Sequence, residues 1–319
     1  MKILVTGGAG FIGSHLCEKL LERGHEVAGL DNLSTGRMEN IDHLKKQRGF
    51  KFVFGTVLDE EMVRRWVRWA DQIYHMAAAV GVKFIIDHPL DSITVNVRGT
   101  ENILEAANFG KKKTLIASTS EIYGKSNKIP FREEDDRTLG STHIHRWSYS
   151  QTKALDEFLA FAYYREKRLP VVIARLFNTC GPRQTGDYGM VLPRFVKSAL
   201  LEHPITIYGD GLQTRCFTYV DDAVEAMVKL MASSRAVGNM FNVGHHQRVT
   251  INDLARKIKS ATRSRSPIVR IPYDKAYEKG FEDMRHRVPD LTKIWKAVKW
   301  KPKISLDEII RRVIEYHEQ

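Results

Sequence analysis

A glycine-rich turn near the start of the chain limits the folds that this sequence can adopt. The apolar segment at residues 2–6 precedes a helix-like run at residues 11–23, and Gly7, Gly10 and Gly13 mark the turn that joins them. Glycines at these spacings permit a tight turn, let the backbone approach a pyrophosphate and allow close helix-to-strand packing. The helix N-terminus also favours the phosphate charge. The sequence therefore predicts a strand, turn and helix unit that binds a dinucleotide.

Strand-like and helix-like segments alternate through the first half of the chain. This alternation is typical of a parallel sheet covered by helices on both faces. We therefore expect an α/β fold: a Rossmann-type doubly wound parallel sheet with a smaller C-terminal substrate-binding lobe. The expected strands are 2–7, 25–31, 51–55, 72–77, 113–118 and 170–176, and the expected helices are about 11–23, 60–69, 90–109, 147–167 and 306–316.

The pattern loosens into loops and short helices from Asn178 onward. This change suggests a division of the chain into two parts. We expect residues 1–178 to form the NAD-binding domain, with a later contribution from about 215–245. Residues 179–319 are expected to form mainly the substrate-binding lobe.

The choice of cofactor depends on Asp31, which ends the second predicted strand 18 residues after Gly13. An acidic side chain at this place accepts hydrogen bonds from the ribose hydroxyls of the adenosine and repels a 2′-phosphate. The sequence therefore predicts NAD in preference to NADP. Arg37 lies nearby in the sequence and leaves binding of a 2′-phosphate open.

Composition argues against several other classes of protein. No apolar run reaches the roughly 20 residues of a membrane span, and the chain starts directly with a strand, so we expect a cytoplasmic protein with no membrane partner. Cys17, Cys180 and Cys216 show no metal-binding spacing, so we expect reduced, buried thiols and no metal site. The net charge of +12 is spread along a chain without a nucleic-acid-binding motif. This charge therefore favours a phosphorylated small molecule over nucleic acid.

A tyrosine and a lysine stand four residues apart in the amphipathic segment RWSYSQTKALDEF. Tyr149 and Lys153 therefore share one face of the predicted helix. A lysine ammonium beside a phenol, together with the positive nicotinamide ring, lowers the phenol pKa by stabilising the phenolate. Tyr149 is therefore expected to act as a general base near neutral pH.

Further motifs, in a fixed order along the chain, resemble the extended short-chain dehydrogenase/reductase family. They are the glycine turn, DNLSTG at 31–36, HMAAA at 75–79, NVRGT at 96–100, and Tyr149 with Lys153. The resemblance implies a homodimer formed by the helices near 90–109 and 147–168. Apolar positions at helical spacing on the second of these helices are Leu155, Phe158, Leu159 and Ala162.

The resemblance also implies a set of cofactor-binding residues. The chain departs from the family pattern at Thr56, where many members have an aspartate that helps to hold adenine, and this leaves Thr56 and the backbone of Val57 for that task. The implied residues are Gly7, Gly10, Phe11, Ile12, Gly13, Asp31, Asn32, Ser34, Thr35, Gly36, Thr56, Val57, Met76, Ala77, Ala78, Asn96, Tyr149 and Lys153.

Two hydroxyls and a carboxylate, Thr119, Ser120 and Glu121, follow the fifth predicted strand. We expect Thr119 or Ser120 to hydrogen-bond the reacting sugar hydroxyl and move its proton. Glu121 adds an acid/base group that simple 4-epimerases of the family commonly lack, and it is useful when oxidation at carbon 4 is followed by bond breaking at carbon 5 or 6. A carboxylate that only anchors a loop is the alternative.

The Thr-Ser-Glu triplet resembles two subfamilies, the UDP-glucuronate decarboxylases and the GDP-mannose 4,6-dehydratases. The strings DNLSTGRMENIDHL, RWSYS, QTRCFTYVDD and HRVPDLTK are similar to the decarboxylases. The resemblance implies that arginines hold the diphosphate, because a planar guanidinium pairs bidentately with phosphate oxygens. The implied substrate-binding residues are Asn178, Arg183, Val191, Leu192, Tyr208, Gln213, Arg215 and Arg287.

The most specific hypothesis from the sequence is an NAD-dependent UDP-glucuronate decarboxylase that works through a 4-keto intermediate. A UDP-sugar 4-epimerase, acting on UDP-glucose or UDP-glucuronate, is an alternative, and so is a nucleotide-sugar 4,6-dehydratase of the GDP-mannose or dTDP-glucose type. An NAD-binding regulator without turnover is an alternative from another class. The expected catalytic residues are Thr119, Ser120, Glu121, Tyr149 and Lys153.

Overall fold

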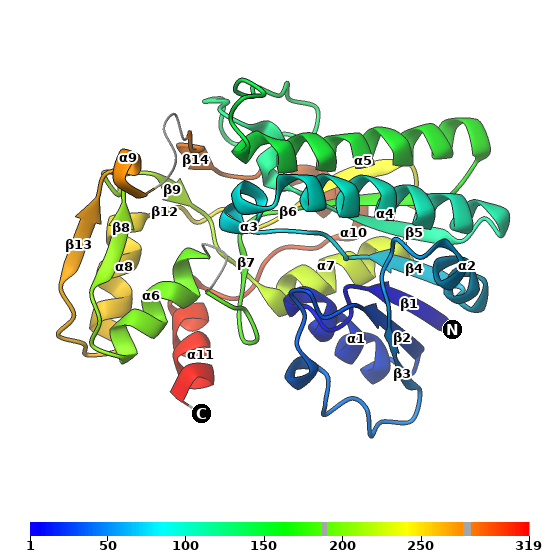
Figure 1. Ribbon diagram of the computed structural model, residues 1–319, viewed down its shortest axis with the longest axis horizontal. Helices are drawn as coiled ribbons and strands as arrows, with labels where there is room; N and C mark the ends of the chain where they lie inside the picture. The colour runs from blue at the N-terminus through cyan, green and yellow to red at the C-terminus, as the bar shows by residue number, and fades with distance from the viewer. Residues whose placement is uncertain (187–189, 277–281, 319) are drawn as a thin grey trace.

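One parallel sheet forms the centre of the molecule (Figure 1). The computed structural model describes residues 1–186, 190–276 and 282–318. Seven strands of this part of the chain form the sheet in the order β11-β6-β5-β4-β1-β2-β3, and all neighbours run parallel. This order is that of a doubly wound Rossmann-type sheet, so the predicted fold class is confirmed. The strands are β1 (Lys2–Thr6), β2 (Glu26–Asp31), β3 (Phe50–Phe54), β4 (Gln72–His75), β5 (Lys113–Thr119), β6 (Val171–Leu176) and β11 (Asn239–Val243).

Helices cover both faces of this sheet (Figure 1). Successive residues of β1 point to opposite faces, so Ile3 and Val5 join a core with α1 and α7, whereas Leu4 joins a second core with α2, α4 and α5. The long helices α4 and α5 pack against each other on the second face. The helices are α1 (Phe11–Glu22), α2 (Glu60–Trp69), α3 (Val82–Asp87), α4 (Pro89–Phe109), α5 (Arg146–Lys167), α7 (Val220–Ala232) and α10 (Thr292–Val298).

A smaller group of elements lies at the end of the sheet opposite the N-terminus (Figure 1). Its strands form short pairings, in which β13 joins β8, and β9 lies between β12 and β14. Its helices are α6 (Val191–Leu200), α8 (Ile251–Ala261), α9 (Tyr273–Ala276) and α11 (Leu306–Glu318). The short strands are β7 (Thr179–Cys180), β8 (Ile205–Tyr208), β9 (Thr214–Arg215), β10 (Thr218–Tyr219), β12 (Val249–Thr250), β13 (Ile268–Ile271) and β14 (His286–Arg287).

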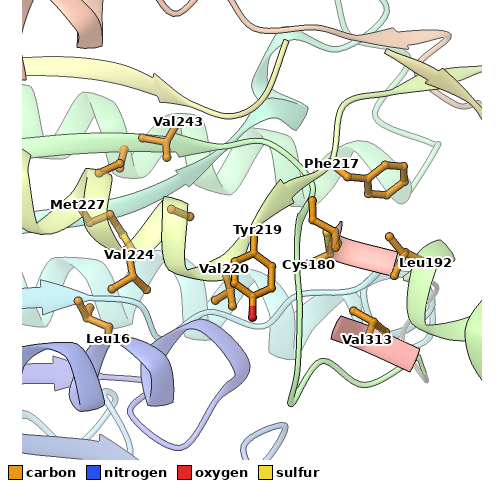
Figure 2. Packing of buried hydrophobic residues seen from close by; sticks show 14 of the residues in the cluster. Leu16, Cys180, Leu192, Phe217, Tyr219, Val220, Val224, Met227, Val243 and Val313 are labelled. Carbon is orange, nitrogen blue, oxygen red and sulfur yellow. The ribbon is translucent and has the colours of Figure 1, made fainter. Parts of the chain in front are cut away.

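A continuous apolar core joins the sheet to this smaller group (Figure 2). Val220, Val224 and Met227 of α7 belong to the same buried cluster as Leu16 of α1 and Val313 of α11. Burial of an apolar side chain of this size contributes about 1.5–3 kcal/mol, so a shared cluster fixes the smaller group against the sheet. The space between the sheet and the smaller group is therefore enclosed by helices and strands that are packed in fixed positions.

The local sequence pattern predicted six strands of the sheet but missed β11. Its sequence, NMFNV, is short and has polar residues at both faces, so it carries little periodicity of its own. β11 pairs with β6 from Asn239↔Val172 to Val243↔Leu176. Among the described residues, no helix combines the length and apolar character of a membrane span. Cys17, Cys180 and Cys216 are buried and unbridged, as predicted.

Candidate active site

A cavity of about 630 Å³ follows the carboxyl ends of the parallel strands and reaches the smaller group of elements. This is where open α/β sheets bind their ligands, because the loops after neighbouring strands converge there. The predicted residues that line it are Gly7, Gly10, Phe11, Ile12, Gly13, Asp31, Asn32, Ser34, Thr35, Thr56, Val57, Met76, Ala77, Ala78, Thr119, Ser120, Glu121, Tyr149, Asn178, Val191, Leu192, Tyr208, Gln213, Arg215 and Arg287.

The glycine turn forms one wall of this cavity, and its conformation excludes side chains. Gly7 has a φ of 70°, and a Cβ atom there would lie 2.9 Å from the backbone nitrogen of Ala77. A Cβ atom on Gly13 would overlap the carbonyl oxygen of Gly7. These glycines therefore let the turn pack closely against the loop after β4 and against α1. Gly7, Gly10 and Gly13 also line the cavity at the N-terminus of α1, the position at which turns of this kind bind a pyrophosphate.

Asp31 ends β2 with its carboxylate held by backbone N–H groups. Its Oδ2 accepts a hydrogen bond from Ala9 at 3.0 Å, and its Oδ1 accepts one from Leu33 at 2.8 Å. Burial raises the pKa of the Asp31 carboxyl, and these hydrogen bonds oppose that shift. Gly36 does not line the cavity, but a Cβ atom there would lie 2.8 Å from Asp31 Oδ1, so the loop folds back over this carboxylate.

Asn96 of α4 is buried behind the loop that follows β4, where the sequence had suggested a direct cofactor contact. Its Oδ1 accepts a hydrogen bond from the backbone of Ala79 at 2.8 Å, and its Nδ2 donates to Thr152 of α5 at 3.3 Å. Asn96 is not among the lining residues. It therefore holds the loop that contains Met76 and Ala77 against the two long helices.

Tyr149 lies in the first turn of α5 and lines the cavity with Thr119 and Ser120. Thr119 ends β5, and Ser120 begins the short 3-10 helix η2 (Ser120–Tyr123). The carboxyl end of one strand and the N-terminal turn of a helix thus bring a phenol and two hydroxyls together. This grouping can bind a carbinol and accept its proton.

The groups around Tyr149 shift the pKa of its phenol in opposite directions. Burial raises the pKa of the phenol, and the carboxylates of Glu121 and Asp156 act in the same direction. A hydrogen bond with Thr119 and the charge of Arg287 lower this pKa. The phenol therefore needs further positive charge close by before it can act as a base near neutral pH.

Lys153 lies one turn after Tyr149 on α5 but does not line the cavity. Its ammonium is buried and lies 2.6 Å from Oδ2 of Asp156, three residues further along the helix. The sequence predicted that this ammonium supports the phenol of Tyr149, and it did not anticipate the carboxylate. The spacing of three residues between Lys153 and Asp156 was the signal that could have shown the pair.

Three arginines and two carboxylates, which we call the arginine cluster, line the cavity near Tyr149. Pairing of β14 with β9 sets Arg287 beside Arg215, although the two residues are far apart in the sequence. Glu121 of η2 and Asp283 lie between the guanidinium groups. The N–O distances are 2.8 Å for Arg146 to Glu121, 3.1 Å for Arg146 to Asp283, 2.7 Å for Arg215 to Asp283 and 3.2 Å for Arg287 to Glu121.

The arginine cluster keeps both of its acids ionised. Burial raises the pKa of Glu121, but Arg146 and Arg287 lower it below its ordinary value. The same balance holds the pKa of Asp283 well below its usual range, with Arg215 as the strongest opposing charge. Burial lowers the pKa of Arg287 to about 10, so this guanidinium stays charged at neutral pH. The five side chains together carry a net charge of +1.

Arg183, which the sequence predicted to bind the diphosphate, is not among the residues that line the cavity. Its guanidinium is 2.9 Å from Glu18 of α1, so it joins the loop after β7 to that helix. Arg194 had no predicted role, but it lines the cavity, and its guanidinium lies 4.6 Å from the ring centre of Tyr208. Arg146 and Asp283 of the arginine cluster were also missed.

Curated relatives of the chain are sugar-nucleotide enzymes that match it over its whole length. A UDP-N-acetyl-alpha-D-glucosaminuronate decarboxylase from Bacillus cytotoxicus is 41% identical over 319 residues, which cover 100% of this chain and 98% of the relative. UDP-glucuronic acid decarboxylase 1 from Arabidopsis thaliana is 37% identical over 317 residues, which cover 98% of this chain and 69% of the relative.

A solved structure has the same fold as this chain. It is a UDP-glucuronic acid 4-epimerase from Bacillus cereus in complex with UDP-glucuronic acid and NAD, with a TM-score of 0.90 and 29% sequence identity, and the match covers 100% of this chain and 99% of that one. The family model described as GDP-mannose 4,6 dehydratase matches residues 4–313. The resemblance predicted from the motifs is confirmed, and the chain belongs to the GDP-mannose 4,6 dehydratase family of extended short-chain dehydrogenase/reductase enzymes.

Proposed function

We propose that this protein is an NAD-dependent UDP-hexuronate decarboxylase that converts UDP-glucuronate to UDP-xylose. The observation that carries the proposal is the arginine cluster beside Tyr149, with its net positive charge. A hexuronate brings a carboxylate at carbon 6 as well as a diphosphate, and guanidinium groups pair bidentately with both. The two curated relatives, both decarboxylases of UDP-hexuronates, support the same choice.

In this mechanism Tyr149 removes the proton of the 4-hydroxyl while Thr119 and Ser120 hydrogen-bond the oxygen. NAD, held by the glycine turn and Asp31, would supply positive charge that favours the phenolate, and it would serve as hydride acceptor and then hydride donor for carbon 4. The resulting 4-keto sugar is a β-keto acid, so the bond between carbons 5 and 6 breaks with its electrons passing to the ketone as an enolate. Carbon dioxide leaves, and carbon 5 takes a proton from water. Tyr149 then returns a proton to the oxygen on carbon 4.

Glu121 has a narrower role in this scheme than its residue type alone suggests. Arg146 and Arg287 keep its pKa below the ordinary value, so a carboxylate and not a carboxylic acid faces the sugar. A carboxylate in this place can order a water molecule or a sugar hydroxyl for the steps at carbon 5, and it holds the two guanidinium groups in position. Asp283 holds Arg215 in the same way, at 2.7 Å.

The deciding experiment compares four sugar nucleotides with the purified protein. UDP-glucuronate, UDP-N-acetylglucosaminuronate, UDP-glucose and GDP-mannose are incubated separately, and the products are identified by mass and by chromatography. We expect loss of carbon dioxide from UDP-glucuronate. Formation of UDP-galacturonate without loss of carbon dioxide would establish a 4-epimerase instead, and loss of water from GDP-mannose would establish a 4,6-dehydratase.

UDP-N-acetylglucosaminuronate is included in that experiment because of the relative from Bacillus cytotoxicus. The relative that is 41% identical over the full length acts, by its name, on a hexuronate with an N-acetyl group at carbon 2. Both sugars present the same carboxylate to the arginine cluster, so decarboxylation of the N-acetylated sugar alone would keep the reaction and change the substrate. The ratio of kcat/KM for the two sugars decides between them.

The carboxylate of Asp31 is expected to determine the preference for NAD over NADP. Asp31→Ser removes the charge that repels a 2′-phosphate, so the ratio of NAD to NADP affinity should fall by about tenfold or more, equivalent to about 1.4 kcal/mol. Fluorescence titration with both dinucleotides measures this ratio. Asp42→Ser, which removes an exposed carboxylate outside the cavity, is the matched control. Equal affinities in the unmodified protein would contradict the role of Asp31.

We also propose that the protein is a homodimer in which α4 and α5 pair with their copies. Apolar side chains stay exposed on these helices, with Phe109 at 78% and Phe158 at 67% exposure, and Leu155 lies beside Phe158 on α5. We expect light scattering at micromolar concentration to give twice the mass of one chain, and Phe158→Glu to give one chain mass. Leu201→Glu, on an exposed apolar residue after α6, should stay dimeric. A monomeric unmodified protein would exclude this assembly.

A cytoplasmic location is part of the same proposal. Three buried, unbridged thiols suit a reducing compartment. Localisation of a tagged chain by fractionation tests it.

A further inference from the structure

A buried ion pair lies on the same face of α5 as Tyr149. Tyr149, Lys153 and Asp156 follow one another at spacings of four and three residues, so they share one face of the helix. Lys153 is 2% exposed and Asp156 is fully buried, and the N–O distance between them is 2.6 Å. A carboxylate without a cation is costly in such a place, and so is an ammonium without an anion. The pair is therefore a coupled unit.

We propose that Asp156 is a positioning residue that fixes the ammonium of Lys153 and offsets its charge, and thereby sets the pH at which Tyr149 takes a proton from the substrate. This inference rests on the proposed hydride transfer at carbon 4. Asp156 touches Lys153 and acts on Tyr149 only through space and through that lysine. The hydrogen bond at 2.6 Å is charge-assisted, and such bonds are the strong ones in a protein interior.

The neighbouring strand β4 and helix α4 place little further charge beside Lys153 and Asp156. His75, at the end of β4, is hydrogen-bonded through Nδ1 to the hydroxyl of Thr6 at 2.8 Å. Its Nε2 is hydrogen-bonded to the hydroxyl of Thr100 of α4 at 3.1 Å. Burial lowers the pKa of His75 to about 3, so its ring is neutral at physiological pH. Burial raises the pKa of Asp156, and Lys153 opposes that shift.

Other charged groups face the phenol or the pair from further elements. Glu121 of η2 and Arg287 of β14 act on Tyr149 with opposite signs. Glu157, the next residue on α5, is bound by Arg175 of β6 at 2.7 Å and is compensated there. Removing the charge of Asp156 therefore leaves an ammonium without its nearest anion, and this favours the phenolate.

The test measures how the rate of NADH formation in a single turnover with UDP-glucuronate depends on pH. Asp156→Asn keeps an oxygen that can accept a hydrogen bond from Lys153 but removes the charge, so we expect the midpoint of the rising limb to fall by about one pH unit. Asp156→Ala removes the acceptor as well, so it should lower the midpoint and also the maximal rate. Glu157→Gln removes the neighbouring buried carboxylate and should leave the midpoint unchanged.

A second measurement does not depend on turnover. The phenolate absorbance of Tyr149, obtained by subtracting the spectrum of a variant that also carries Tyr149→Phe, is followed against pH while circular dichroism reports the fold. Asp156→Asn should increase the phenolate fraction at the alkaline end of the folded range. If the unmodified protein reduces no NAD with any sugar, the proposed function fails, and this titration alone decides the role of Asp156.

Three results of the pH measurements would overturn the inference. They are an unchanged midpoint in Asp156→Asn, a midpoint moved to higher pH, and an equal shift in Glu157→Gln. Failure of both Asp156 variants to fold, with normal folding of Glu157→Gln, would assign Asp156 to stability and would also overturn it.

Discussion

Tyr149→Phe is expected to abolish the reduction of bound NAD by UDP-glucuronate, with a fall of about 10²–10⁴-fold or more in the rate of NADH formation. The phenol lines the cavity with Thr119 and Ser120, and in the proposed mechanism it accepts the proton of the 4-hydroxyl. Phenylalanine keeps the ring and its packing but cannot accept this proton. Stopped-flow absorbance of NADH in a single turnover gives the rate directly.

The control for this loss is Tyr164→Phe, which removes a hydroxyl from the same helix. Tyr164 does not line the cavity, so the rate of NADH formation should remain that of the unmodified protein. Both variants should bind the sugar nucleotide, which equilibrium dialysis can measure. Rapid NADH formation by Tyr149→Phe would show that another group is the base.

Glu121→Gln is expected to separate oxidation from the chemistry that follows it. The variant keeps Tyr149, so NADH should still appear. Release of carbon dioxide should slow by about 10²–10⁴-fold because the variant lacks the carboxylate to which we assign the ordering of the steps at carbon 5. NADH should therefore persist while the 4-keto sugar accumulates. Absorbance of NADH and release of labelled carbon dioxide, followed in the same single turnover, measure both steps.

Asp283→Asn provides the matched comparison, because it removes the other carboxylate of the arginine cluster. Asp283 contacts Arg146 and Arg215 and lies 3.9 Å from Arg287, whereas Glu121 contacts Arg146 and Arg287 at 2.8 and 3.2 Å but not Arg215. We expect Asp283→Asn to raise KM, since Arg215 loses its support, without persistence of NADH. Release of carbon dioxide at full rate in Glu121→Gln would limit Glu121 to anchoring the guanidinium groups.

The elements with local sequence signals were predicted well. Strands β1 to β6 are short apolar segments bounded by turn residues, and each was located to within a few residues. The glycine turn was predictable for a related reason, because the positive φ of Gly7 restricts the residue type at that position directly. Where the conformation of a residue depends only on its own segment, the local sequence is enough to predict it.

Residues whose role depends on distant pairing were not predictable in the same way. Asp283 enters the arginine cluster only because β14 pairs with β9, and these strands are two residues long. The sequence predicted that Arg183 binds the diphosphate because the residue type suits phosphate, and it did not anticipate that the guanidinium lies 2.9 Å from Glu18 of α1. A charged side chain pairs with whatever the fold brings near it, and that partner lies 165 residues away in the chain.

The position of β11 at the edge of the sheet has a consequence for the order in which the molecule can be assembled. β6 ends at Leu176, but its outer edge is paired only by residues 239–243. During synthesis from the N-terminus, the unpaired N–H and C=O groups of β6 stay exposed until more than sixty further residues have left the ribosome. An edge of this kind is a template for pairing between nascent chains. Chaperones that shield this edge of β6, or slow release of the completed chain, would therefore raise the yield of folded protein. They would leave the stability of the finished sheet unchanged.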